Sequence, residues 1–139
     1  MAKIHNKLMI PGPIQVHPDV LNVLNQPVEP YYGKEWVEKY SKVVSLLQRV
    51  FNTKNDVILM AGSGSCALDA CLGSSLKTGE NIIIANNGFF GDRLVSIAKQ
   101  YFLKTIEVKA KWGEKINPDD VCKTLDAHPD VKSIGNSPK

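Results

Sequence analysis

A short run of glycine and serine, Gly62-Ser63-Gly64-Ser65, stands between an apolar stretch and a segment with the pattern of a helix. In an open parallel sheet, ligands bind beyond the carboxyl ends of the strands, where loops lead into helices. The backbone N–H groups of Ser63, Gly64 and Ser65, together with the positive end of the helix, would form a cradle for an anion. Glycine lets that anion approach the backbone closely, so a phosphate group is the expected occupant.

Three interpretations of this loop compete, two from the residues of the loop and a third from the wider pattern of the sequence. It could be a tight strand-to-helix turn that binds nothing. It could bind a dinucleotide, because Gly62-x-Gly64-x-x-Ala67 fits that pattern, although Asn86 and Asn87 stand where an acidic residue should hold a ribose. It could hold the phosphate of another cofactor. A nucleoside-triphosphate loop is excluded, since no Lys-Ser or Lys-Thr pair follows the glycines.

Hydrophobic periodicity predicts the elements that must position this loop. An arm over residues 1–34, with a short helix at 19–24, is expected to precede an amphipathic helix at 35–51 that is buried along one side. Strands are then predicted at 56–61, 81–85, 105–110 and 131–135, with helices at 65–76, 92–102 and 117–127. Apolar strands that alternate with helices favour an α/β fold with a mainly parallel sheet and flanking helices.

Composition limits the possible partners. The 139 residues are 43% hydrophobic and 22% charged, and the net charge of +3 comes from scattered lysines without a basic block, which argues against nucleic acid. No apolar stretch is long enough to span a bilayer or to serve as a secretion signal. Three cysteines without metal-ligand spacing fit a reducing compartment, so a cytoplasmic protein is expected, with Cys66 as a buried packing residue.

Four blocks of sequence resemble, in order, the N-terminal part of class V pyridoxal-phosphate aminotransferases. They are LMIPGPIQVHPDVL, YYGKEWVEKY, VFNTKNDVILMAGSGSCALDA and ANNGFFGDRLVSIA, and the resemblance runs from about Leu8 to Ile134. The alanine–glyoxylate and serine–pyruvate branch is the most similar. The resemblance implies an incomplete fold-type-I large domain over 35–139, preceded by the arm at 1–34. It also implies pyridoxal 5'-phosphate as cofactor and a homodimer as the complete enzyme.

The resemblance assigns roles to particular positions. Ser63, Gly64 and Ser65 correspond to the turn that donates hydrogen bonds to the cofactor phosphate. Phe90, expected in the loop after the strand at 81–85, corresponds to the aromatic residue that stacks on the pyridine ring. Gly12 and Tyr31 correspond to segments that line the substrate side, and relatives direct the region of Tyr31 toward the partner subunit.

The reaction implied is transfer of an amino group from a small amino acid, alanine or serine, to a 2-oxo acid such as glyoxylate or pyruvate. Such chemistry needs a lysine that forms a Schiff base and an acid against the pyridine nitrogen. In the family that the chain resembles, both follow the strand that matches 131–135, so this chain alone is expected to be inactive. A non-catalytic phosphate-binding α/β module, a desulfurase or phosphoserine aminotransferase, and a partner polypeptide with the missing half remain alternatives.

Overall fold

The computed structural model describes residues 7–136. The chain forms two compact units, Met1–Leu59 and Met60–Lys139, and each is described by itself. The division predicted from the sequence, between an arm at 1–34 and a large domain at 35–139, stays a prediction. Within the described range, no helix combines the length and the apolar character needed to cross a membrane.

The first unit contains two helices. The short helix α1, Pro18–Val23, confirms the sequence prediction and begins with proline in its first turn, where a missing N–H costs nothing. The long helix α2, Lys34–Val50, is also confirmed, but the expectation that one side is buried is wrong. None of its residues is buried, and the best-covered apolar side chains, Trp36, Val44 and Leu47, are half-buried. No sheet is present among the described residues of this unit to cover the apolar face.

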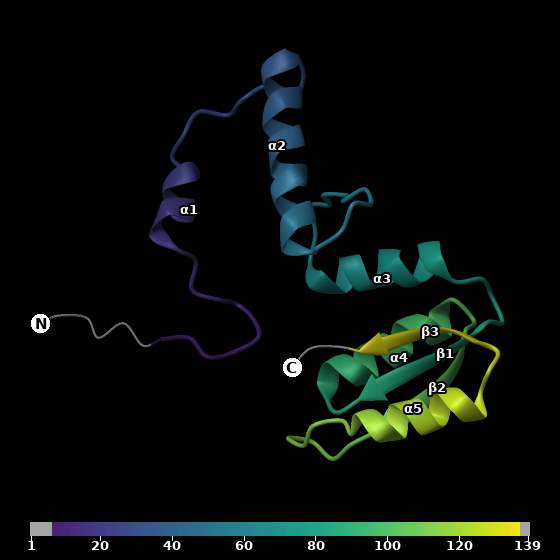
Figure 1. The fold of residues 1–139 in the computed structure, drawn as a ribbon. Helices are drawn as coiled ribbons and strands as arrows, with labels where there is room; N and C mark the ends of the chain where they lie inside the picture. Colours follow the sequence, from purple (N-terminus) through teal and green to yellow (C-terminus); the bar gives the residue numbers. More distant parts are fainter. Residues whose placement is uncertain (1–6, 137–139) are drawn as a thin grey trace, which may run out of the picture. The chain divides into compact units, whose positions relative to one another are not determined.

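The second unit is an α/β layer structure (Figure 1). Its elements alternate along the chain: α3 Gly64–Ser75, β1 Asn81–Asn86, α4 Phe89–Gln100, β2 Lys104–Lys109, α5 Pro118–Ala127 and β3 Val131–Asn136. The three strands form one parallel sheet in the order β2-β1-β3, with Ile83 of β1 opposite Ile106 and Ile134. The predicted α/β class, with its parallel sheet and flanking helices, is confirmed.

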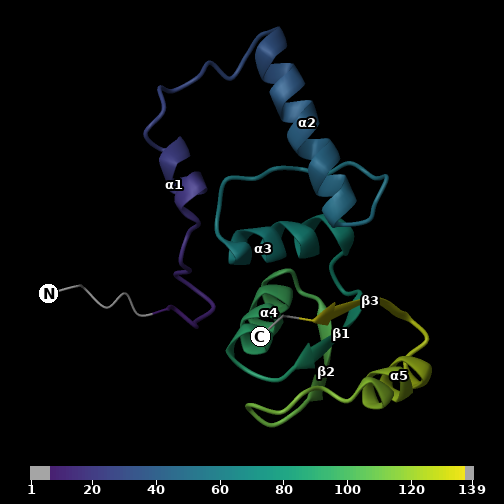
Figure 2. The ribbon, with the colours of Figure 1, turned by 60° about the vertical axis from the view of Figure 1, so that its left-hand side comes forward.

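The core of this unit lies on one face of the sheet, beneath α3 and α4. Figure 2 shows α4 on one side of the strands and α5 on the other. The strand β1 is central, and its three isoleucines at 82–84 are completely buried. Leu72 of α3 packs with Leu94 and Ala98 of α4 in the same cluster. Burial of a large aliphatic side chain is worth about 1.5–3 kcal/mol, so these contacts hold both helices on the sheet.

The strand predicted at 56–61 is wrong. Residues 56–61 form no strand and belong to no sheet, and the side chains of Ile58 and Met60 are exposed. A strand needs a neighbour to accept its backbone hydrogen bonds. The sheet of the described chain has only β1, β2 and β3, so this apolar segment has the pattern of a strand without a partner.

Candidate functional site

The glycine–serine run forms the start of helix α3. Ser63 is the residue before the first helical turn, with an extended backbone at φ −76° and ψ 162°. Its hydroxyl oxygen accepts a hydrogen bond from the Cys66 amide at 3.3 Å. The side chain of Ser63 is therefore used as a helix cap, which leaves the backbone to contact a ligand.

Two backbone donors at this end of α3 are available. The amides of Gly64 and Ser65 occupy the first two helical positions, where the helix itself supplies no acceptor. No hydrogen bond within the described chain reaches either amide. A Cβ atom built on Gly64 would meet no atom within 4 Å. The turn thus combines free donors, the positive end of a twelve-residue helix and open space, which suits a phosphate group.

Phe90 lies in the first turn of α4 and not in the loop in which the sequence placed it, because the helix begins three residues before the predicted position 92. The helix begins at Phe89, because Gly88 serves as its N-terminal cap residue. Phe90 is half-buried, while its neighbour Phe89 is 67% exposed. The two rings meet edge-on with centroids 5.5 Å apart. The ring of Phe90 is thus partly held by the protein and partly accessible.

The turn at Ser63–Ser65 and Phe90 lie in the same unit. Helices α3 and α4 run alongside each other, and both begin toward the end of the sheet at which β1 terminates (Figure 1). The carboxyl ends of parallel strands are where ligands of α/β proteins bind. The roles of Ser63, Gly64, Ser65 and Phe90 in binding a cofactor stay predictions.

One polar contact adds to the apolar packing of α3 on α4. The Tyr101 hydroxyl, after the end of α4, donates a hydrogen bond to Asp69 of α3 at 3.2 Å. Partial burial, and then the charge and hydrogen bond of Asp69, raise the pKa of Tyr101 above its usual value of 10.0. A Cβ built on Gly73 would come within 2.8 Å of the Tyr101 ring, so glycine there permits this contact.

Gly12 and Tyr31 belong to the first unit. Gly12 is exposed, and a Cβ built on it would meet no atom within 4 Å. Tyr31 is 79% exposed and touches Tyr32 edge-on, with ring centroids 5.7 Å apart. Neither residue makes a contact in the described chain that defines a pocket for a substrate, and their roles stay predictions.

Two other features of the described chain do not form a second site. Cys66, expected to be buried, is exposed in the first turn of α3, because that turn lies at the surface of the unit.

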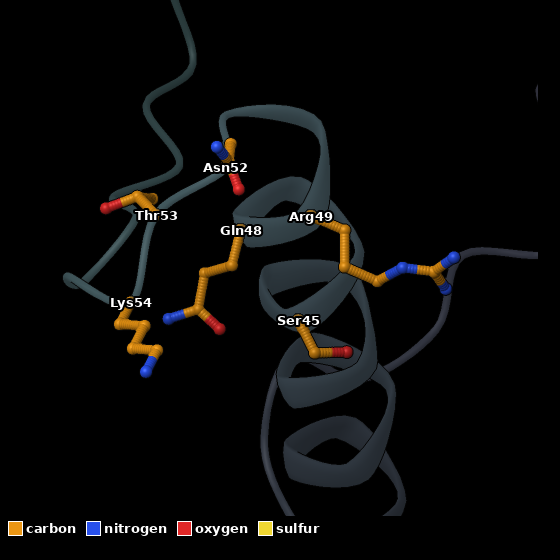
Figure 3. A pocket seen from close by; sticks show the side chains of 6 residues that line it. All are labelled: Ser45, Gln48, Arg49, Asn52, Thr53 and Lys54. Carbon is orange, nitrogen blue, oxygen red and sulfur yellow. The ribbon is translucent and has the colours of Figure 1, made fainter.

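A hollow at the end of α2 is lined by polar residues. Arg49 points away from Gln48 and Lys54, so the two cationic side chains of the hollow do not converge (Figure 3). Its lining residues are Ser45, Gln48, Arg49, Asn52, Thr53 and Lys54.

Sequence reasoning missed one residue at the candidate site. Asn86, the last residue of β1, is 5% exposed, and its carboxamide joins β1 to α4 and β2. In the comparison with the dinucleotide-binding pattern, Asn86 appeared only as a residue that does not suit the binding of a ribose. An amide side chain at the end of an otherwise apolar strand was the available signal, because a buried polar group must find hydrogen-bond partners.

Comparison with known proteins finds aminotransferases among the relatives. An uncharacterized aminotransferase of Methanocaldococcus jannaschii is 35% identical over 127 residues, which are 91% of this chain and 33% of that protein. The small subunit of a soluble hydrogenase of Synechococcus is 33% identical over 87% of this chain and 32% of its own length. The crystal structure of alanine–glyoxylate aminotransferase from Nostoc matches with a TM-score of 0.77 and 28% identity, over 85% of this chain and 32% of that one.

Other homologues are alanine–glyoxylate, ureidoglycine–glyoxylate and pyridoxamine–pyruvate aminotransferases. No family model matches the chain. The chain spans about a third of the length of the relatives it matches, a coverage that fits an N-terminal portion. The resemblance seen in the sequence is confirmed, and so is the cofactor of the homologous class, pyridoxal phosphate.

Proposed function

We propose that this chain, a homologue of class V aminotransferases of the alanine–glyoxylate type, contributes the phosphate-binding half of a pyridoxal-phosphate site. The complete enzyme would move an amino group from alanine or serine to a 2-oxo acid such as glyoxylate or pyruvate. The observation that carries the proposal is the pair of unpartnered amides at Gly64 and Ser65, at the end of the unit where Phe90 also lies.

Each residue has one task in this proposal. The amides of Gly64 and Ser65 donate hydrogen bonds to the cofactor phosphate, and the α3 N-terminus stabilises its negative charge. The ring of Phe90 stacks on the pyridine ring and excludes water from that face, an interaction worth about 0.5–1.5 kcal/mol beyond burial. When bound, the cofactor supplies an electron sink for the carbon that loses or gains the amino group.

The remaining parts of the site come from outside this chain. The lysine that binds the cofactor covalently and the acid that keeps its ring nitrogen protonated lie in the rest of the protein or in a partner polypeptide. Gly12 and Tyr31 face the substrate side, Tyr31 toward the second subunit of a homodimer, and the enzyme acts in the cytoplasm. The chain alone is expected to be catalytically inactive.

Titration calorimetry of the chain tests the proposal with four probes: pyridoxal phosphate, pyridoxal, inorganic phosphate and a nicotinamide dinucleotide. Pyridoxal phosphate should bind more tightly than pyridoxal, and inorganic phosphate should compete with it, because most contacts are made to the phosphate. Alanine and glyoxylate should not be converted, and borohydride treatment should not fix the cofactor to one particular lysine.

The alternatives predict different titrations. Preference for the dinucleotide would make this a dinucleotide-binding domain, and equal affinity for inorganic phosphate and pyridoxal phosphate would make it a non-catalytic phosphate-binding module. A cofactor adduct at one lysine, found by mass spectrometry, would refute the inactivity of the chain. No binding of any probe would reject the phosphate site itself.

A further inference from the structure

The side chain of Asn86 is a buried polar group at the end of β1, four residues before Phe90. It is 5% exposed, and among residues 7–136 it is the polar side chain that the core buries most completely. An unpaired buried amide would cost about 1–3 kcal/mol, so its partners must be accounted for. Its hydrogen-bond partners lie at the start of α4 and on β2.

Three hydrogen bonds fix this carboxamide. Its nitrogen donates to Oδ1 of Asp92 at 2.9 Å and to Oε2 of Glu107 at 3.0 Å. Its oxygen accepts the backbone N–H of Gly88 at 3.3 Å. Both carboxylates are acceptors only, and the amide of Gly88 is a donor only. Asparagine meets these demands, whereas aspartate would present like charge to both acids and donate nothing.

Close packing adds a steric restraint to these bonds. A Cβ built on Gly91 would lie 2.2 Å from Oδ1 of Asn86 and 2.9 Å from its Cα. Gly91 is itself buried in the first turn of α4. The carboxamide therefore contacts the chain at Gly88, Gly91 and Asp92, on both sides of Phe90. One side chain therefore contacts the segment that carries the aromatic ring at three residues.

We propose that Asn86 is a positioning residue that sets the orientation of Phe90 toward the cofactor ring. The inference rests on the proposed function, since it assigns Asn86 to the support of the same site. Glu107, which also pairs with Lys109 at 3.3 Å, anchors the carboxamide to β2. The start of α4 is thereby tied to both β1 and β2.

Replacement of Asn86 by aspartate tests the inference, because it keeps the shape and removes both donors. A matched control exists at the other end of β1, where the Asn81 carboxamide donates to Asp130. Asn81→Asp also sets two carboxylates against each other, but far along the strand from Phe90. The readouts on the full chain are pyridoxal-phosphate affinity, the circular dichroism induced in the bound cofactor, and amide hydrogen exchange at 88–92.

Asn86→Asp should weaken pyridoxal-phosphate binding about tenfold or more, lose the induced dichroism at saturation and speed exchange at 88–92. Asn81→Asp should leave all three near the unsubstituted values, even where its melting temperature falls. The double variant N86D/E107Q, which restores an amide–carboxylate pair, should recover part of the dichroism.

Two contrary results are distinguishable. If the unsubstituted chain binds pyridoxal phosphate and Asn86→Asp keeps the dichroism per bound cofactor, Asn86 is structural only and the inference is overturned while the proposed function stands. If the unsubstituted chain binds no pyridoxal phosphate, the proposed function fails and this inference with it.

Discussion

Proline at position 64 would remove one backbone N–H that is proposed to donate a hydrogen bond to the phosphate, while leaving the helix intact. Gly64 is the first residue of α3, the position at which proline is favoured because the N–H has no helical acceptor. The preceding residue, Ser63, already has the extended backbone that proline requires of its neighbour. A Cβ at 64 meets nothing within 4 Å, so the ring has room.

The expected effects on stability and on binding have opposite signs. Proline at a compatible position restricts the unfolded chain and stabilises the fold by about 0.4–1 kcal/mol. A hydrogen bond to a charged group contributes about 1.5–3 kcal/mol, so loss of the Gly64 amide should weaken binding of pyridoxal phosphate about 10- to 100-fold. A general loss of structure would instead lower stability and affinity together.

Calorimetric titration of Gly64→Pro, with Gly64→Ala as the control, separates these effects. Alanine keeps the amide and fills the same open space, so its affinity should stay within about twofold of that of the unsubstituted chain. Both variants should unfold at urea concentrations no lower than the original. If proline at 64 leaves the affinity unchanged while the helix remains folded, the α3 amides do not bind the phosphate, and the reasoning about this turn is wrong.

Three further predictions concern the ring and the contact between α3 and α4. Phe90→Ala should weaken pyridoxal-phosphate binding about 2- to 10-fold by fluorescence titration, whereas Phe89→Ala, as a control, should change it less. Gly73→Ala should lower the free energy of unfolding by about 1 kcal/mol in urea titrations, because displacement of the Tyr101 ring outweighs the gain in helix propensity; unchanged stability would show that the ring moves freely. Since the pKa of Tyr101 is raised in the folded chain, its contribution is complete below pH 10.0 and is lost as the pH rises through the folded value. Tyr101→Phe should therefore reduce the alkaline loss of stability, and equal alkaline curves for both proteins would contradict a role for the Asp69 contact.

The elements that the sequence predicted correctly are those specified by short-range signals. Ser63 caps α3, and Asn117 with Pro118 starts α5, so these helices begin where the sequence places them within one or two residues. The three isoleucines of β1 favour a buried central strand, because both of its faces are covered. Phe90 was wrongly placed in a loop, since α4 begins at Phe89, three residues before the predicted start at 92.

The elements that the sequence predicted wrongly depend on partners outside the local pattern. Residues 56–61 have the composition of a strand, and α2 has an apolar stripe, yet neither is covered in the described chain. The hydrophobic pattern of a sequence predicts which surfaces become buried, but it does not predict which segment covers them. The chain spans about a third of the length of its relatives. Its wrong predictions fall at these two apolar surfaces, for which the described chain supplies no covering segment.

Asn86 illustrates how a site depends on contacts that no motif describes. Its partners Asp92 and Glu107 are 6 and 21 residues away in the chain, so no spacing rule joins them. From the sequence alone, Asn86 was considered only because a dinucleotide-binding protein would have an acid there to hold a ribose. The structure shows why an acid is unsuitable here. Asp92 and Glu107 already face the position, and a third carboxylate would repel both of them. An amide is the side chain that satisfies both carboxylates and the Gly88 N–H at once, and that requirement follows from the fold rather than from the ligand.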